Sequence, residues 1–265
     1  MRKHKGLLYL LFSVSALAAA SLSCGVSDVS NLFATDTPTP TLTFTPTLTS
    51  TPSPTATSTP TRTPTSTPLP SGISTEKLSD GSTLFIDYDN RYQMTLPEEW
   101  VIIPIAKEDL EVVLEELGRE DPDIAQAAQA FKNLDSDVLR MAALNRNAEY
   151  LVGGYASNIT VTAIDEPVFA VMPLSFITGA LEESFTQQGI KVLTTGVNVI
   201  ENASGAEVEY MDVEQTLSGI RVLQRIVMFQ SNEKLILVTI STTQQFKDEI
   251  FQMAEQIGGS VEFIK

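Results

Sequence analysis

The stretch "KLILVTI", residues 234–240, decides the fold class, because it is apolar at consecutive positions that point to opposite sides of a strand. Such a strand is covered on both faces and lies in the centre of a sheet. It belongs to the last of four strands predicted in series, at 190–201, 205–216, 220–230 and 233–242. The short links between these strands predict an antiparallel meander.

Two amphipathic helices flank this series of strands. One is predicted at 173–189, where Gly189 ends a helix whose apolar positions are Leu174, Ile177, Leu181 and Phe185. The other closes the chain and ends at Gly258-Gly259, with an apolar face formed by Phe246, Ile250, Met253, Ala254 and Ile257. Gly179 lies inside the first helix and costs about 1 kcal/mol relative to Ala, so we expect a close packing contact there.

The part before residue 173 predicts more strands and a helical insertion. Strands are expected at 82–89, 91–97, 100–105, 149–154 and 157–165. Between them, 107–146 shows three helical patterns: an apolar stripe from Leu110 to Leu117, a second helix beginning at Asp121-Pro122, and a third in "DSDVLRMAALN" at 135–145. The fold class is therefore α+β, a mostly antiparallel sheet of about six to seven strands with helices on both faces.

The stretch "DYDNRYQMTLPEEWVII" carries a recognisable pattern. Tyr92, Leu96, Pro97 and Trp100 place an aromatic strand before a Leu-Pro step and a tryptophan, and Ser260 lies in a short tail. This pattern resembles the opening of PsbP-like and Mog1-like domains, which are α/β/α sandwiches. The resemblance covers about 82–265 apart from 107–146, a span of single-domain size, and we place the globular domain at 71–265.

The resemblance implies a modest set of activities. Members of these families are mostly non-enzymatic, either extrinsic subunits of a photosynthetic complex or partners of a small GTPase. Some bind divalent cations through histidine and acidic residues. The only histidine here is His4, outside the domain, so that cation site cannot be transferred to this chain. The resemblance therefore implies a fold more strongly than an activity.

The first 23 residues are expected to be a signal peptide, because a basic start is followed by an uncharged apolar run and small residues. Ala20, Ser21, Leu22 and Ser23 before Cys24 resemble the cleavage box of a bacterial lipoprotein, although Ser21 stands where leucine is commoner. Cys24 is then the lipidated first residue of the mature chain, anchored by at least two acyl chains. The alternatives are a short membrane anchor and an unmodified cysteine.

Residues 35–70 contain 16 Thr and 9 Pro in 36 positions. Proline density and scarce apolar surface predict a disordered, extended linker. It would span on the order of 100 Å at about 3.1 Å per residue. Its threonines are open either to O-glycosylation or to no modification. Residues 24–34 form a short anchor-proximal segment, so the linker would hold the domain away from a membrane.

Charge and residue types exclude several functions. The domain at 71–265 holds 31 Asp and Glu and 13 Lys and Arg, a net charge of 13 − 31 = −18. Such a charge repels nucleic acid and anionic lipid. The mature chain has no histidine and no cysteine besides Cys24, which excludes disulfides, thiolate zinc sites and imidazole catalysis. We therefore expect no cofactor and no nucleic-acid partner.

Three acidic groups are candidate sites. Asp87, Asp89 and Asn90 offer oxygen ligands for a divalent cation, or else are solvated groups at a strand edge. Glu207, Glu209, Asp212 and Glu214 fit either a carboxylate hydrolase or cross-strand pairs, with a turn at 216–219 placing Glu214 opposite Arg221 and Tyr210 opposite Arg225. Their change from odd to even positions predicts a bulge near Met211. The acidic run 108–123 fits a solvated helix face or a docking surface.

The preferred hypothesis is a lipid-anchored, extracytoplasmic, non-catalytic interaction or assembly module at the cell membrane. It contacts the membrane through lipidated Cys24 and a protein partner through the domain. The alternatives are a protein that binds a small ligand or a divalent cation and, less favoured, a carboxylate-based hydrolase.

Overall fold

The computed structural model describes residues 70–103, 138–169, 171–202, 204–217 and 219–264, together with Glu115, Arg119 and Ala128. Three predicted features lie outside the described residues. They are the leader and lipidation site at 1–24, the linker up to residue 69 and, apart from Ala128, the apolar stripes of the two helices predicted between Leu110 and residue 134. None of the helices in the described part is both long and apolar enough to cross a lipid bilayer.

The main sheet has eight strands, and every pair in it is antiparallel. Its order is β10 (Asn198–Val199), β11 (Glu209–Leu217), β12 (Ile220–Ser231), β13 (Lys234–Thr243), β8 (Asn158–Ile164), β5 (Leu139–Asn145) and β4 (Trp100–Ile103), with β9 (Lys191–Val192) also beside β11. β13 lies in the middle, and its residues after Lys234 are buried on both faces. The prediction from "KLILVTI" is confirmed.

A smaller antiparallel sheet packs on one side of the main one. It consists of β1 (Ile73–Lys77), β2 (Thr83–Asp87), β3 (Tyr92–Leu96) and β14 (Glu262–Phe263), in that order. A separate hairpin pairs β6 (Leu151–Val152) with β7 (Tyr155–Ala156). The strands are thus divided between an eight-stranded and a four-stranded sheet, whereas the sequence predicted one sheet of six to seven strands.

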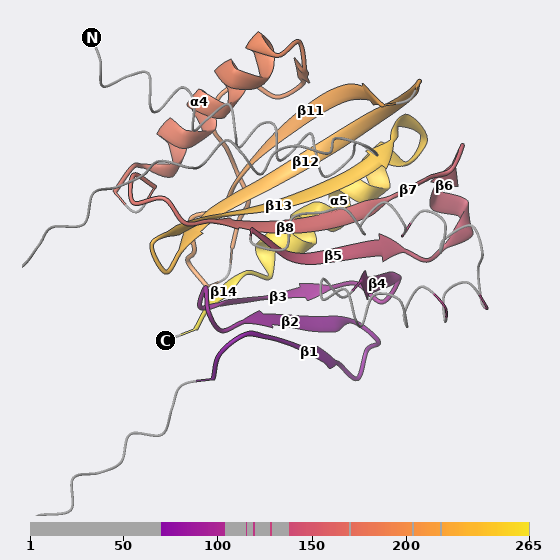
Figure 1. Ribbon diagram of the computed structural model, residues 1–265, viewed down its shortest axis with the longest axis horizontal. Helices are drawn as coiled ribbons and strands as arrows, with labels where there is room; N and C mark the ends of the chain where they lie inside the picture. Colours follow the sequence, from indigo (N-terminus) through magenta and orange to yellow (C-terminus); the bar gives the residue numbers. More distant parts are fainter. Residues whose placement is uncertain are drawn as a thin grey trace, which may run out of the picture. The chain divides into compact units, whose positions relative to one another are not determined.

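The two described α-helices cover opposite faces of the main sheet, as predicted (Figure 1). They are α4 (Leu174–Gln187) and α5 (Lys247–Gly259), accompanied by the short 3-10 helices η2 (Ala148–Tyr150) and η3 (Gln244–Phe246). Residues alternate along β12, so Ile226 and Met228 pack in the core under α4, while Val227 and Phe229 pack in the core under α5. Phe85, Tyr92 and Met94 of the smaller sheet join the α5 core. The α+β fold class is confirmed.

Three element predictions are wrong. The third helix predicted at 135–145 is wrong for its described part, since 139–145 is β5, and the insertion predicted at 107–146 does not include this strand. Met141 and Ala143 pack on the α5 face, and Ala142 faces the other side. A short strand that is apolar on both faces has apolar residues at helical spacings too, and this led to the wrong prediction. The strand predicted at 190–201 is reduced to β9 and β10, separated by Gly196 with φ +73°. A Cβ on Gly179 would meet open space, not a close contact.

The β11–β12 hairpin differs from its prediction in register. Leu217 pairs with Ile220, so the turn holds two residues and every pairing moves by two positions. Arg225 therefore lies opposite Asp212 and not opposite Tyr210. The predicted bulge near Met211 is absent, because the register runs without interruption from Glu209 to Leu217. Acidic residues stand at both odd and even positions of this segment because side chains on both faces of β11 are buried.

Candidate functional site

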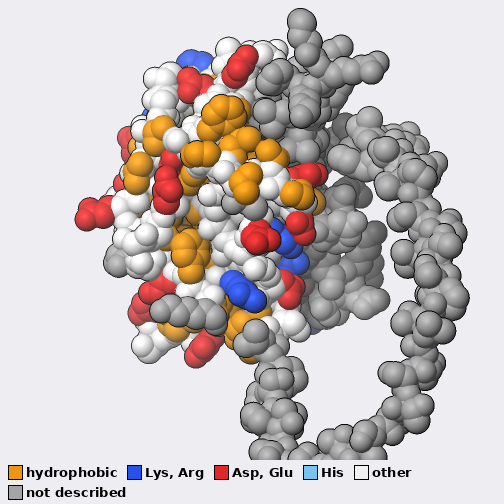
Figure 2. All heavy atoms as spheres, turned by 90° about the vertical axis from the view of Figure 1, so that its left-hand side faces the viewer, with side chains coloured by type: hydrophobic (Ala, Val, Ile, Leu, Met, Phe, Trp, Pro, Cys, Tyr) orange, Lys and Arg blue, Asp and Glu red, His pale blue; other side chains and the backbone are white. Residues whose placement is uncertain are grey.

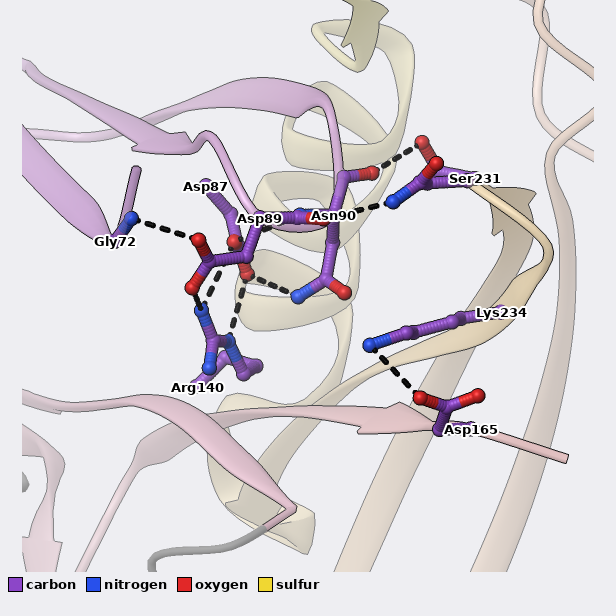
Figure 3. A network of polar contacts seen from close by, with 9 residues as sticks. Gly72, Asp87, Asp89, Asn90, Arg140, Asp165, Ser231 and Lys234 are labelled. Atoms are coloured by element: carbon purple, nitrogen blue, oxygen red, sulfur yellow. Dashed lines mark hydrogen bonds and ion pairs between the residues drawn. The ribbon is translucent and has the colours of Figure 1, made fainter. Parts of the chain in front are cut away.

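The three residues predicted as cation ligands lie around one guanidinium group (Figure 3). Arg140 of β5 donates from Nε to Asp87 Oδ2 at 2.9 Å and from Nη2 to Asp87 Oδ1 at 3.0 Å. The same Nη2 donates to Asp89 Oδ2 at 2.8 Å. Asn90 donates to Asp87 from its side chain at 2.6 Å and its backbone at 3.1 Å. The group joins the turn after β2 to the main sheet.

The electrostatics of this group follow from those contacts. Asp87 is fully buried, so the bidentate contact supplies the positive charge that its carboxylate lacks in the core. The backbone N–H of Gly72 donates to Asp89 at 2.8 Å, and this bond, followed by that from Arg140, lowers the pKa of Asp89. The hydrogen bond to Asp87 raises the pKa of Arg140. Asp89 and Arg140 are thus held in their charged forms.

The network extends to the turn between β12 and β13. Ser231 donates to the carbonyl oxygen of Asn90 at 2.6 Å, and the Asn232 side chain donates to that of Asp89 at 2.8 Å. Beyond it, Lys234 pairs with Asp165 at 3.2 Å. These contacts fix the edge of the smaller sheet against the end of the main sheet.

A cation at this position would have to displace the arginine from both aspartates. Among the described residues, no three acidic, cysteine or histidine side chains come together in an arrangement that could hold a metal ion. Cation binding by Asp87, Asp89 and Asn90 remains a prediction, whereas their contacts with Arg140 are formed in this structure.

The residues of the family pattern lie in and beside the core. Tyr92, Leu96 and Trp100 are buried, and the Tyr92 ring packs edge-on to Phe229 with ring centroids 5.1 Å apart. The carbonyl of Pro97 accepts a hydrogen bond from the backbone N–H of Trp100 at 3.3 Å, so the Leu-Pro step turns the chain into β4. The Tyr92 hydroxyl and the Trp100 indole N–H are buried and have no hydrogen-bond partner among the described residues.

A second arginine forms a similar internal pair on β12. Arg225 donates to Asp212 from Nε at 2.8 Å and from Nη2 at 2.9 Å, and both side chains are buried. Its guanidinium lies 4.2 Å from the centroid of the Tyr210 ring and 4.7 Å from that of Phe251. Glu255 of α5 accepts from Nη1 at 2.5 Å. The arginine thereby ties α5 to the strands next to the sheet edge.

An open cleft lies beside this arginine, between β10 and α5. It has a volume of about 410 Å³ and is lined by Val199, Ile200, Glu201, Tyr210, Gln252, Glu255 and Gln256. Val199 and Val197 beside it are 63% and 51% exposed. The sequence analysis missed this feature, because it predicted one long strand at 190–201 in which these valines would have been core residues.

A polar row crosses the opposite face of the main sheet. The side chain of Gln215 donates to Gln224 at 2.8 Å, and Gln224 donates to Ser241 at 3.0 Å. Tyr155 bonds to Ser241, and the Asn158 amide donates to the Tyr155 hydroxyl at 3.1 Å. Burial raises the pKa of Tyr155 well above its usual value, so the phenol stays neutral. The row links five strands, and its members satisfy one another.

Comparison with known proteins gives no matching family model and no matching curated protein. Solved structures are similar to the chain. Cyanobacterial PsbP (CyanoP) from Synechocystis sp. PCC 6803 has 10% identity and a TM-score of 0.44, over 69% of this chain and 93% of its own. LpqN, described as involved in cell envelope biogenesis of Mycobacterium tuberculosis, has 8% identity and a TM-score of 0.36, over 73% and 91%.

One of these structures is a PsbP domain, the family that the sequence pattern resembles. Similarities with such low identities and TM-scores carry no argument about this chain. They do not identify a site, a ligand or a partner, and these have to come from the residues of the chain itself.

Proposed function

We propose that the protein is a lipid-anchored, extracytoplasmic, non-catalytic interaction module. The leader at 1–23, followed by Cys24, supports the anchor, and the Thr/Pro-rich linker at 35–70 supports a domain held away from the membrane. The membrane contact is made by the lipidated cysteine, and the domain is left to meet a protein partner. Function then resides in the surface of the domain.

The use of the acidic residues supports a non-catalytic role. Asp87 and Asp212 are buried against Arg140 and Arg225, and Glu214 is paired with Arg221. Carboxylates that act as general acids or bases need a position in a cleft and a pKa near the working pH. Asp87 and Asp212 instead each accept two hydrogen bonds from a guanidinium, an arrangement that suits a structural role.

The observation that carries the proposal is the position of β10 at one end of the main sheet, where no strand of the described residues pairs with its outer side. Ile200 N–H donates to Val208 at 2.9 Å, and because bonding alternates along an antiparallel pair, the backbone groups of Val199 point away from β11. Val199 is 63% exposed and is one of the residues that line the cleft. An edge of this kind accepts an added strand from a partner, while a neighbouring pocket takes one of the partner's side chains.

The cleft also favours a second candidate function, the binding of a small ligand. Its volume of about 410 Å³ falls within the range of small-molecule sites. Tyr210 and Ile200 would supply apolar contact, and Glu201 would supply charge. A ligand of this kind would bind without a partner protein, and this separates the two candidates.

The anchor is tested by mass spectrometry of the N-terminal peptide from membranes of the native host. We expect a peptide that begins at Cys24 and carries acyl chains, and a Cys24→Ala variant that is not lipidated. An unmodified protein that retains residues 1–23 would contradict the lipid anchor.

The interaction surface is tested by photo-crosslinking on intact cells with a photoreactive residue at position 198. We expect a defined crosslinked product that Val199→Lys abolishes, because a charged edge residue opposes strand addition. The matched control is Val171→Lys, which alters another exposed valine, located before α4 (Figure 2 shows apolar side chains at the α4 end of the molecule). Equal products from both variants would rule out the β10 edge.

A further inference from the structure

Glu209 is a buried acid that none of the ion pairs above accounts for. It begins β11, pairs with Met228 of β12, and points towards the face that α4 covers. Its exposed fraction is 1%. Because a buried carboxylate loses its hydration, such groups are paired with a cation or become neutral.

Its polar neighbour on α4 is Thr178. The Thr178 Oγ1 atom lies 2.5 Å from Glu209 Oε2 and 3.1 Å from the carbonyl oxygen of Leu174. A threonine hydroxyl has a single hydrogen, and a carbonyl oxygen can only accept. Both contacts are full hydrogen bonds only when Thr178 donates to Leu174 and Glu209 donates to Thr178. This count places a hydrogen on the carboxyl group of Glu209.

The charges around Glu209 also favour its neutral form. Its charged neighbour in the chain is Glu207, two residues before β11 begins, and Glu182 of α4 accepts a bond from the backbone amide of Gly196 at 3.2 Å. β10 contributes the apolar Val199, which pairs with Glu209. Burial raises the pKa of Glu209 above its usual value; the Thr178 contact opposes this shift and the charge of Glu207 adds to it. None of the described cations acts on the group.

We propose that Glu209 keeps its proton to a higher pH than an exposed glutamate does in the folded protein, and that its ionisation loosens α4 from β11. On ionisation the proton leaves to solvent, the Thr178 hydroxyl turns to the carboxylate, and the Leu174 carbonyl loses that donor. The charge then adjoins the apolar core formed by α4 and the sheet, which includes Ile177 and Met211. Because α4 covers this core, its movement would admit the water that the carboxylate requires.

The proposal fixes the sign of a pH effect. When the pKa of a carboxyl group is raised in the folded state, the group does not reduce the free energy of unfolding at pH values below its unfolded-state pKa. Stability then falls as the pH rises through the folded pKa. The folding constant drops about tenfold for each pH unit between the two values.

The direct test is an NMR titration of the full-length protein, which follows the side-chain carboxyl carbons of Glu209 and Glu207. Glu207 is exposed and two residues away, so it is the matched reference. We expect the midpoint of Glu209 to exceed that of Glu207 by about one pH unit or more. A Glu209 midpoint at or below that of Glu207 would overturn the proposal.

The second test compares the urea-induced unfolding of Glu209→Gln and Glu207→Gln with that of the native chain. Glutamine keeps a donor towards Thr178 and cannot ionise. We expect Glu209→Gln to match the native chain near about pH 4 and to have a folding constant about tenfold larger near pH 8. Glu207→Gln should follow the native profile closely. A Glu209→Gln profile parallel to the native one at all pH values would refute the pH linkage.

The consequence for α4 has its own measurement. Amide hydrogen exchange within α4 is compared between the native chain and Glu209→Gln at each pH. This comparison removes the intrinsic pH dependence of exchange, which both proteins share. Protection of α4 should fall in the native chain alone as the pH rises. Equal protection in both proteins would contradict the loosening of the helix.

Discussion

Replacement of Arg140 by Met tests the idea that this arginine holds the two sheets together. Methionine keeps the apolar stem of the side chain and removes the guanidinium. Asp87 is then left fully buried with Asn90 as its remaining partner. Breaking a buried pair from one side costs about 3–5 kcal/mol. Since the Arg140 side chain is 21% exposed and both Asn90 bonds persist, we expect the lower end, about 3 kcal/mol.

The assay is equilibrium unfolding in urea, with the slope compared between variants. Asp87→Asn in the Arg140→Met background removes the unpaired charge, and it should recover about half of the loss. Arg119→Met is the matched control, because Arg119 pairs with Glu115 on an exposed helical position and should cost less than about 0.5 kcal/mol. The reasoning fails if Arg140→Met costs no more than this control, or if Asp87→Asn recovers nothing.

The same variant changes the response to acid. The folded-state pKa of Asp89 is lowered, first by the Gly72 amide and then by Arg140. Its contribution to stability is therefore present above the unfolded pKa and is lost as the pH falls through the folded pKa. Arg140→Met removes part of this shift, so its stability should change less between neutral and acidic pH. A native and a variant profile of equal slope would show that Arg140 does not set this pKa.

Three further outcomes are expected. Gly179→Ala should raise the free energy of unfolding by about 1 kcal/mol, because a Cβ at position 179 meets open space. Gly258→Ala should lower the free energy of unfolding by about 1–3 kcal/mol, because a Cβ at position 258 would lie 2.6 Å from the side chain of Ile200. Tyr92→Phe removes a buried hydroxyl without a partner and should be neutral or stabilising by up to about 1 kcal/mol in urea unfolding. Calcium at millimolar concentration should raise the melting temperature of Arg140→Met, because this variant frees the carboxylates of Asp87 and Asp89 from the arginine. If calcium raised the melting temperature of the native chain equally, that result would instead support the predicted cation site.

The sequence predicted the elements whose apolar period is unambiguous. α4, α5 and the alternating β3 carry one buried face each, and β13 begins with the apolar run that is buried on both faces. It failed on β5, because "LRMAALN" is buried on both sides and an apolar run of that length is compatible with a helix as well as a strand. The error had a further consequence. Arg140 was placed in a helix, and so its contact with Asp87, 53 residues earlier, could not be anticipated.

The pairing of β11 with β12 failed for a different reason. A turn of two residues and a turn of four residues join the same strands with equally good patterns, and only packing chooses between them. The two-residue turn sets Arg225 opposite Asp212, where both are buried and the guanidinium also lies over Tyr210. The ion pair of Glu214 with Arg221 forms in either register, so it could be predicted without the correct turn.

The positions of Arg140 and Arg225 also affect which partners the surface of the domain can bind. Arg140 and Arg225 each pair with a buried aspartate and with one exposed acid, Asp89 and Glu255 respectively, so they offset little of the surplus of acidic residues at the surface. The domain holds 31 acidic and 13 basic residues. A surface of that charge is repelled by anionic lipid, an effect that acts over about 8 Å at physiological ionic strength. For a domain anchored as we propose, repulsion and the linker act in the same direction, away from the membrane. The edge at β10 would then be open to a partner, and its neighbour Glu201 would favour one that brings positive charge.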